Sequence, residues 1–413
     1  MGRQGNGRRR VRGPRDSAPL LPGRARSTAL RATRRHLTQR AFFGIDVVFG
    51  AARAGWLETP HGRVQTPAFM PVGTQGAVKG LLPSQLEAAG VQMLLGNAYH
   101  LHLRPGEQVV AGLGGLHGFM AWPHPILTDS GGFQVLSLAE LRRVTDEGVE
   151  FRSHIDGARL VLTPERATEI QNALGADVIM AFDDCVPYPC ERDAAQVAMR
   201  RTLAWARRCQ RAHARPADRA LFAIVQGSVF DDLRVECAER LVDMDFAGYA
   251  VGGLSVGEGD ELMYRVLDAT VPRLPANKPR YLMGVGTPMN LIECIERGVD
   301  LFDCVLPTRN GRSGHAFTAR GIVRLRNLRH RDDPRPLDAT CDCATCRGFS
   351  RGYLRHLFHA REIAAAVLTS LHNVTFYQRL VRGCRRAILE GRLAAFKSAF
   401  LEATSQPEDT ERA

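Results

Sequence analysis

From Phe42 onward, short apolar runs alternate with longer stretches in which apolar residues recur at helical spacing. A short apolar run bounded by Gly, Pro, Asn or Asp is typical of a buried strand. Eight such runs are predicted as strands: Pro67–Val72, Met93–Asn97, Pro125–Thr128, Asp177–Phe182, Leu221–Gln226, Ala247–Gly252, Tyr281–Val285 and Leu301–Val305. The segments between them are predicted as helices, such as Pro83–Ala89, Pro164–Leu174, Ala194–Ala214 and Asp231–Leu241.

This alternation predicts parallel strands, because each helix returns the chain to the same end of the sheet. Eight strand–helix units favour an α/β fold of the (β/α)8 type, the TIM barrel. A doubly wound open sheet is the alternative, but no G-x-G-x-x-G motif follows the first strand. No apolar run approaches the roughly 18 residues of a membrane span, so none is predicted.

The last predicted strand, Leu301–Val305, contains an acid, Asp303, in an otherwise apolar run. A buried carboxylate is unfavourable unless it has partners, so such a residue is either paired or chemically active. The following segment, Thr308–Gly314, is predicted as a polar loop and carries Arg309 and Arg312. An acid at a strand end beside a basic segment suggests chemistry on a phosphate-bearing substrate. A structural Asp that caps a turn is the alternative.

Other polar residues and glycines fall at the ends of the predicted strands, where a barrel places its active site. They are Asp129, Asp183, Asp184, Gln226, Gly252, Gly253, Gly284 and Gly286. Turn chemistry explains any one of them but not the set, and glycines allow a flat ligand to approach the backbone closely.

The net charge of +12 belongs almost entirely to the N-terminus, because residues 1–40 contain twelve Arg, no Lys and one acid. We expect residues 1–41 to be a disordered tail. A nucleic-acid-binding arm, an organellar transit peptide and an over-extended start are three interpretations of it. The remaining chain is nearly neutral, so any nucleic acid would bind to a local basic patch.

Three of the ten cysteines form the cluster Cys341-x-Cys343-x-x-Cys346. Three thiolates at this spacing can share one Zn²⁺, which needs a fourth ligand for a closed structural site. His356, His359 and His372 are the downstream candidates, and spacing does not choose among them. The other cysteines are scattered, which favours a reducing compartment and a metal site over a disulfide framework.

Several longer motifs together resemble tRNA-guanine transglycosylases of the bacterial type, from about Phe42 to about Lys397. These motifs are TDSGGFQV (128–135), FDDCVPYP (182–189), VQGS (225–228), GYAVGGLSVGE (248–258), MGVG (283–286) and DCVLPTR (303–309). The resemblance implies a cytoplasmic homodimer with a TIM barrel and a zinc subdomain. It implies that the wobble guanine of tRNAs with G-U-N anticodons is replaced by the 7-deazaguanine preQ1 (7-aminomethyl-7-deazaguanine), in queuosine biosynthesis.

By this resemblance, Asp303 is the nucleophile and Asp129 is the general acid and then the general base. Asp183 accepts the N–H groups of the guanine-like edge, while Gln226 and the Gly253 amide bind the exocyclic oxygen.

Further substrate contacts are implied for Leu254, Phe133, Met283, Ser130 and Cys185. The Leu254 carbonyl accepts from the aminomethyl group, and Phe133 and Met283 sandwich the ring.

The resemblance also implies that Cys341, Cys343, Cys346 and His372 hold zinc, and that Thr308, Arg309 and Arg312 contact tRNA. Val256, where eukaryotic queuine enzymes have Gly, implies a preference for preQ1. Asp184 and Thr287 stand where some members have Glu and Lys, and the second difference implies that one tRNA contact is weaker.

The expected organisation is a catalytic barrel over residues 42–335, a zinc-binding subdomain over 336–376, a helical segment over 377–400 and a disordered tail over 401–413. Two other functions are considered. A catalytically inactive tRNA-binding partner should lack one of the carboxylates, all of which are present here. A metal-dependent hydrolase should carry metal ligands at the strand ends, and His100-x-His102 has suitable spacing but follows the second strand.

Overall fold

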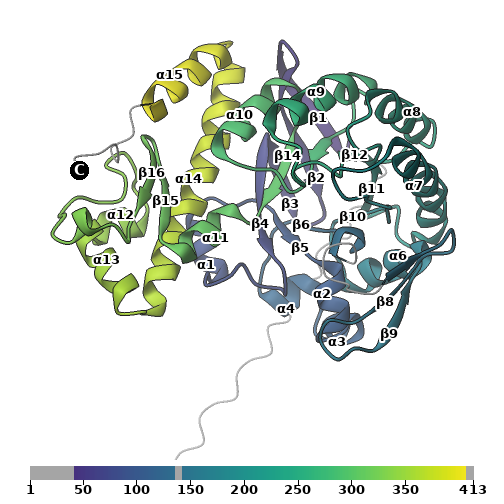
Figure 1. Cartoon of the computed structure of the whole chain (residues 1–413), viewed down its shortest axis with the longest axis horizontal. Helices are drawn as coiled ribbons and strands as arrows, with labels where there is room; N and C mark the ends of the chain where they lie inside the picture. The colour runs from purple at the N-terminus through teal and green to yellow at the C-terminus, as the bar shows by residue number, and fades with distance from the viewer. Residues whose placement is uncertain (1–40, 135–141, 406–413) are drawn as a thin grey trace, which may run out of the picture. The chain divides into compact units, whose positions relative to one another are not determined.

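The computed structural model describes residues 41–134 and 142–405, whose centre is a closed barrel of eight parallel strands (Figure 1). The barrel strands are β4 (Ala68–Gly73), β5 (Leu94–Gly96), β6 (Ile126–Thr128), β10 (Val178–Met180), β11 (Ala220–Val225), β12 (Gly248–Val251), β13 (Arg280–Leu282) and β14 (Leu301–Cys304). Pairing of β14 with β4 closes the ring. Each strand overlaps one of the eight predicted, so the TIM-barrel prediction is confirmed. Of the tail expected at residues 1–41, residues 1–40 lie outside the described residues.

Helices follow the barrel strands in the predicted alternation. They are α1 (Pro83–Ala88), α2 (Ala98–Leu103), α3 (Glu107–Gly112), α4 (Gly115–Met120), α6 (Pro164–Leu174), α7 (Arg192–Ala212), α8 (Asp231–Val242), α9 (Asp260–Thr270) with the 3₁₀ turn η2 (Val271–Arg273), and α10 (Pro288–Glu296). Helix α6 shows why the sequence marks these ends. The Thr163 hydroxyl accepts from the Arg166 amide, Pro164 occupies the first turn, and Gly175 ends the helix at φ 86°. Among the described residues, no helix is long and apolar enough to cross a bilayer.

The N-terminal end of the barrel is covered by an antiparallel sheet that the sequence reading did not identify. It consists of β1 (Phe43–Phe49), β2 (Ala52–Thr59) and β3 (Gly62–Thr66). Leu57 and Val64 belong to the same buried cluster as Met70 and Phe222 from the barrel strands. The buried core thus continues from this sheet into the barrel.

A buried ion pair secures this sheet to the barrel. The Arg53 guanidinium donates to the Asp300 carboxylate, and its Nη1 donates to the Ala276 carbonyl at 2.7 Å. The Asp300 carboxylate also accepts from the Arg280 amide at 2.7 Å. Because these groups come from β2, β13 and the start of β14, they fix the strand that carries Asp303.

A second small sheet, β7 (Arg142–Val144), β8 (Val149–Arg152) and β9 (Arg159–Leu162), lies between β6 and α6 in sequence.

The prediction of a loop at Thr308–Gly314 is wrong, because residues Leu306–Ser313 form the helix α11. Pro307 does not end regular structure here, because proline is favourable in the first turn of a helix, where its missing N–H is not needed. Gly314, at φ 87°, then ends α11.

After α11 the chain forms the predicted metal-binding part, which carries the cysteine cluster Cys341–Cys346, and the C-terminal helices. The elements are β15 (His315–Thr318), β16 (Gly321–Arg324), η3 (Leu328–His330), α12 (Ala344–Gly348), α13 (Arg351–His359), α14 (Ile363–Leu389) and α15 (Leu393–Ser405). The boundary expected between residues 376 and 377 falls within α14. Helix α15 continues beyond residue 400, and residues 406–413 lie outside the described residues.

Helix α14 joins the metal-binding part to the barrel (Figure 1). Its Asn373 donates to the carbonyls of Pro307 and His315, both at 2.9 Å, and accepts from the Phe317 amide. Further along, the Gln378 amide donates to the Phe69 carbonyl of β4 at 2.9 Å. A Cβ at Gly311 would lie 2.6 Å from Ser370 Oγ, so α11 and α14 approach each other closely only because residue 311 is glycine.

Candidate active site

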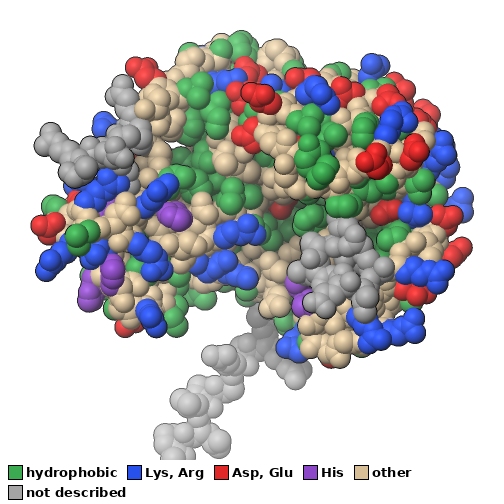
Figure 2. Space-filling model, viewed as in Figure 1, with side chains coloured by type: hydrophobic (Ala, Val, Ile, Leu, Met, Phe, Trp, Pro, Cys, Tyr) green, Lys and Arg blue, Asp and Glu red, His purple; other side chains and the backbone are tan. Residues whose placement is uncertain are grey.

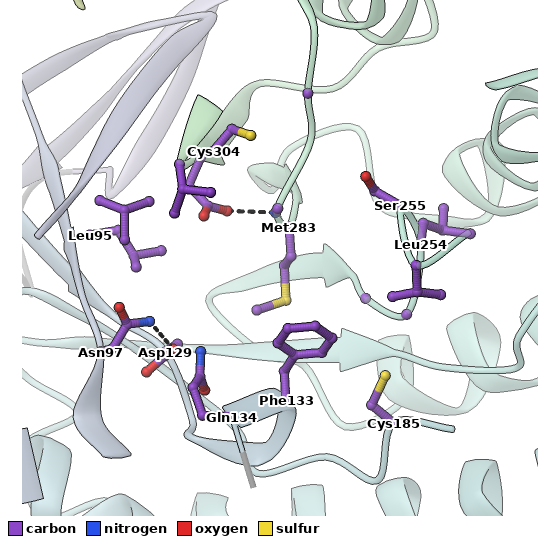
Figure 3. Close-up of a pocket in the computed structure, with 18 of the residues that line it drawn as sticks. Leu95, Asn97, Asp129, Phe133, Gln134, Cys185, Leu254, Ser255, Met283 and Cys304 are labelled. Atoms are coloured by element: carbon purple, nitrogen blue, oxygen red, sulfur yellow. Dashed lines mark hydrogen bonds between the residues drawn. The ribbon is translucent and has the colours of Figure 1, made fainter. Parts of the chain in front are cut away.

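A cavity of about 590 Å³ opens at the C-terminal ends of the barrel strands (Figure 3). Every predicted base-binding or catalytic residue lines it: Asp129, Ser130, Phe133, Asp183, Cys185, Gln226, Gly253, Leu254, Met283 and Asp303. Of the residues predicted to bind tRNA, Arg309 lines the same cavity. The structure therefore brings together side chains that lie far apart in the sequence of the barrel.

Asp303 lies on β14, and its Oδ1 is held by two neutral donors. The Tyr281 hydroxyl donates at 2.6 Å and the Gly284 amide at 2.7 Å. Burial raises the pKa of Asp303, and the hydrogen bonds from Gly284 and Tyr281 oppose this shift only in part. Burial and the Asp303 charge raise the pKa of Tyr281 well above 10, so its hydroxyl keeps its proton and remains a donor. The result is a carboxylate with a fixed orientation at the cavity wall.

Asp129 follows β6 and is held differently. Its carboxylate accepts from the Asn97 side-chain amide and from the Ala98 backbone amide, the latter at 2.8 Å (Figure 3). Burial raises the pKa of Asp129 to about 7, the Asn97 hydrogen bond opposes this shift, and the charge of Asp303 adds to it. A carboxyl group with this pKa can either hold or release a proton near neutral pH.

Asp183 follows β10 and faces the same cavity. The Ser130 hydroxyl donates to its Oδ1 at 3.0 Å, and the Gln226 side-chain amide donates to its Oδ2 at 2.7 Å. Burial raises the pKa of Asp183 to about 6. Because both carboxylate oxygens are engaged by neutral donors, the group has a fixed plane and suits a ligand edge that presents N–H donors.

Glycines leave room for a ligand beside Gln226. A Cβ at Gly253 would lie 2.5 Å from Gln226 Oε1, and a Cβ at Gly252 would lie 2.6 Å from Ile224. Gly253 also has φ +66°, which disfavours any other residue. Figure 3 shows Met283 pointing toward the ring of Phe133, and both side chains line the cavity.

Sequence reasoning missed the residues that hold these groups in place, above all Arg234 of α8. Arg234 is fully buried, and its guanidinium donates to the carbonyls of Ser228, Val225 and Gly252 at 2.7 to 2.8 Å. It therefore fixes the ends of β11 and β12 on either side of Gln226. A signal was present, because Arg234 shares the buried face of α8 with Cys237, Ala238 and Leu241. The sequence likewise predicted Asn97 and Tyr281 only as parts of strands, and not as the donors to Asp129 and Asp303.

The residues predicted to bind tRNA lie together on α11. Arg309 and Arg312 are exposed, whereas Thr308 is buried and its hydroxyl donates to the Val305 carbonyl at 3.4 Å. Figure 2 shows further Lys and Arg side chains gathered over α11, α12 and α13. Thr287 lines the cavity and caps α10, where its hydroxyl accepts from the Asn290 amide.

The three cysteines of the C-terminal cluster converge with His372, and not with His356 or His359, into one buried group. The His372 Nδ1 atom lies 3.2 Å from Cys346 Sγ and 3.7 Å from Cys343 Sγ. Tetrahedral zinc with ordinary bond lengths would separate such atoms by about 3.5 Å. The other ring nitrogen, Nε2, lies 2.7 Å from the Phe317 carbonyl oxygen, a second-sphere contact that orients a metal-binding imidazole. This group could bind a metal ion, and its donor set fits zinc.

The hydrolase alternative finds no support in the part of the chain that the structure describes. His102 pairs with Glu107 at 2.7 Å, and His100 lines the cavity without grouping with other potential metal ligands. The two metal-ligand groups found among the described residues both lie away from the cavity lining.

Comparison with known proteins agrees with this geometry. A family model described as queuine tRNA-ribosyltransferase matches residues 48–406. The queuine tRNA-ribosyltransferase of Caldanaerobacter subterraneus subsp. tengcongensis is 56% identical over 351 residues, which cover 85% of this chain and 94% of that protein. That of Cereibacter sphaeroides is 53% identical over 370 residues, covering 90% and 98%. That of Shewanella halifaxensis is 53% identical over 359 residues, covering 87% and 95%.

Replacing Cys343 by Ala should remove the metal and unfold the metal-binding part, because structural metal binding is coupled to folding. Metal content per chain and urea unfolding measure this. Cys294→Ala, which removes a buried thiol elsewhere, is the matched control and should keep the metal. A Cys343→Ala protein with full metal content would contradict the assignment, as would loss of metal from His356→Ala but not from His372→Ala.

Proposed function

The chain belongs to the queuine tRNA-ribosyltransferase family, and from this premise we propose that it exchanges the wobble guanine of G-U-N anticodons, in tRNAs for Asp, Asn, His and Tyr, for preQ1. The enzyme is a pentosyltransferase that acts on tRNA. The observation that carries the finer proposal is the pair Asp303 and Asp129, two buried carboxylates that line one cavity and are held by different donors.

In the first displacement, an Asp303 oxygen attacks the ribose anomeric carbon, and the bond from that carbon to guanine N9 breaks. Both hydrogen bonds to Asp303 engage Oδ1, which makes Oδ2 the attacking atom. Asp129 donates its proton to the departing guanine. The product is a covalent ribosyl–Asp303 ester with the configuration inverted.

In the second displacement, Asp129 takes the N9 proton of the incoming 7-deazaguanine. N9 then attacks the anomeric carbon, and the bond to Asp303 breaks. Two inversions give net retention, as in retaining glycosidases, which also use one ionised and one proton-carrying carboxyl group. The different hydrogen-bond partners of Asp303 and Asp129 support these two roles.

Base recognition is proposed for the group around Asp183. Its carboxylate would accept the N–H donors of the base, and the Gln226 and Gly253 amides would bind the exocyclic oxygen. The stacking partners would be Phe133 and Met283. Ser130 supports Asp183 through its hydroxyl, and Cys185 lines the cavity with a thiol whose pKa burial raises to about 12.

The anticodon arm would contact α11, where Arg309 and Arg312 suit phosphates and Thr308 packs beneath them. We assign zinc to Cys341, Cys343, Cys346 and His372, where all four ligands come from the protein. Such a site leaves no open position for substrate, so the metal would supply structural cross-linking and no chemistry at the cavity. A cytoplasmic homodimer, which the resemblance implies, belongs to the same proposal.

Asp303→Ala should lower guanine exchange into tRNA by at least about a thousandfold, because no other group would form the covalent intermediate. tRNA affinity should change little, since phosphate contacts dominate it. Denaturing gels should show a covalent tRNA adduct with the wild type only. Asp260→Asn removes an exposed carboxylate from the same cavity and should keep the adduct. An adduct formed by Asp303→Ala would exclude Asp303 as the nucleophile.

The kcat/KM for tRNA should decrease as the pH rises above about 7. Asp129, with its pKa of about 7, then loses the proton that the departing guanine needs. Asn97→Ala removes a hydrogen bond that lowers this pKa, so the alkaline limb should move to higher pH. Ser130→Ala removes a donor to Asp183 instead and should leave the limb in place. A limb that is identical in Asn97→Ala and the wild type would contradict the role of Asp129.

Val256→Gly should improve the use of queuine relative to preQ1. Val256 lines the cavity in a loop that is closed by Glu258, whose carboxylate accepts from the Ser255 and Val256 amides. A β-branched side chain is stiff, so it should exclude the larger substituent of queuine. We expect a change of about 10- to 100-fold in the ratio of kcat/KM values. Val256→Thr keeps the branched shape and should keep the preference. Equal use of both bases by the wild type would refute this steric account.

A further inference from the structure

Positive charge is concentrated in the part of the chain that contains α11, β15, β16 and α13. Residues 306–361 contain twelve Arg, no Lys and four acids, although the chain from residue 41 onward is nearly neutral. Basic and acidic side chains are mixed over α7 and α8, whereas basic side chains predominate over α11, α12 and α13 (Figure 2). The protein body therefore carries a strongly basic surface on this side.

The arginines of this surface differ from many others in having no acidic partner. Exposed arginines that pair with Asp or Glu elsewhere include Arg63, Arg192, Arg215, Arg240, Arg265 and Arg273. In contrast, Arg309, Arg312, Arg326 and Arg355 form no ion pair with any residue that the structure describes. Their charge is not compensated within the described protein, so it creates a positive field that attracts a polyanion.

Two of these side chains are oriented by the protein itself. Arg326 Nε donates to the Ser313 carbonyl at 3.2 Å, and its guanidinium carbon lies 5.0 Å from the centroid of the Phe358 ring. Arg355 Nε donates to the Asn327 carbonyl at 3.0 Å. In both arginines the two Nη nitrogens have no acceptor among the described residues. Each side chain therefore presents a fixed pair of donors, which is the arrangement that binds a phosphate with two hydrogen bonds.

The basic surface is continuous with the wall of the cavity. Arg309 lines the cavity, and Arg312 lies in the last turn of α11. The end of α11 meets both β16 and α13, because a Cβ at Gly314 would lie 3.4 Å from Arg326 Cγ and 3.6 Å from the Phe358 ring. The surface thus runs from the cavity, across the end of α11, to α13.

We propose that Arg312, Arg326 and Arg355 bind the phosphate backbone of the double-stranded stem that closes the anticodon loop. When the reacting base enters the cavity, the loop lies at its mouth, and the adjoining stem must lie over a neighbouring surface. Double-stranded RNA is recognised mainly through its phosphates and 2′-hydroxyls, because its major groove is too narrow for side chains. This inference rests on the proposed function and gives the C-terminal part a role in RNA binding that is separate from its metal.

Binding of an anticodon stem-loop RNA to the full-length, zinc-loaded protein, measured by fluorescence anisotropy, tests this proposal. The double variant Arg326→Gln/Arg355→Gln should bind about tenfold more weakly at about 0.15 M salt. The slope of log K against log salt concentration should become shallower by about 1 to 2, because each lost phosphate contact removes about 0.9. Arg207→Gln is the matched control, since Arg207 is exposed on α7, away from this surface, and it should bind like the wild type.

A single-stranded oligonucleotide with the same loop sequence and no stem separates stem contacts from loop contacts. The wild type should bind the stem-loop more tightly than this oligonucleotide, and the double variant should lose most of that difference. In guanine exchange with the stem-loop, the double variant should raise KM and change kcat little, because neither Arg326 nor Arg355 lines the cavity. Equal weakening of both RNAs would overturn the assignment of these arginines to the stem.

Metal content and Tm show whether the variants fold. If the double variant does not fold, Arg355→Gln decides the question, because it removes one hydrogen bond from a half-buried side chain and should make the slope shallower by about 0.9. An affinity and a slope equal to those of the wild type in folded variants would refute the proposal. The proposed function fails separately, if the wild type binds the stem-loop but exchanges no guanine.

Discussion

The burial of Asp129, Asp183 and Asp303 at one end of the barrel is the constraint on which the rest of the site depends. Each accepts hydrogen bonds from neutral donors: backbone amides, a tyrosine, a serine and two side-chain amides. Burial without a cationic partner raises a carboxyl pKa, and the strength of the neutral donors decides how far. The barrel thus raises the pKa of all three carboxyl groups above the usual range of an aspartate.

These donors come from different strands, so the pKa values depend on the closure of the barrel. Asn97 follows β5, Gln226 follows β11, and Tyr281 lies on β13. Arg234 holds the ends of β11 and β12 by three backbone carbonyls, although burial lowers its own pKa to about 10. At the other end, Arg53 and Asp300 hold β14 to the covering sheet. This rigid placement keeps the hydrogen-bond donors of the three carboxyl groups in fixed positions.

Helix α14 extends this rigidity to α11, which we propose as the surface that binds tRNA. His372 belongs to the metal-ligand group, the next residue, Asn373, holds the start of α11, and Tyr377 donates to the Gly286 carbonyl in the cavity wall at 3.0 Å. A single helix thus connects the metal-binding part, the arginines of α11 and the cavity. Under the proposed function, a metal ion bound far from the cavity would therefore influence how tRNA is positioned against Asp303.

The sequence by itself determined the barrel strands, the carboxylates at their ends and the thiolate cluster, because each depends on a local pattern. Strand burial is visible in apolar runs, and the three cysteines of the potential metal-binding group lie within six residues. Local patterns did not decide whether Leu306–Ser313 is a loop or a helix, because Pro307 is compatible with both a strand end and a first helical turn. Nor did local patterns choose the fourth metal ligand among His356, His359 and His372, and only the resemblance pointed to His372.

Only the tertiary structure decided which residues hold the reactive groups. Asn97 and Asp129 are 32 residues apart, and Asp183 and Gln226 are 43 apart. Hydrophobic periodicity reports which face of an element is buried, not which neighbour it meets. Hydrogen-bond partners and pKa values arise when the barrel closes, because closure removes water from the carboxylates and brings distant donors to them.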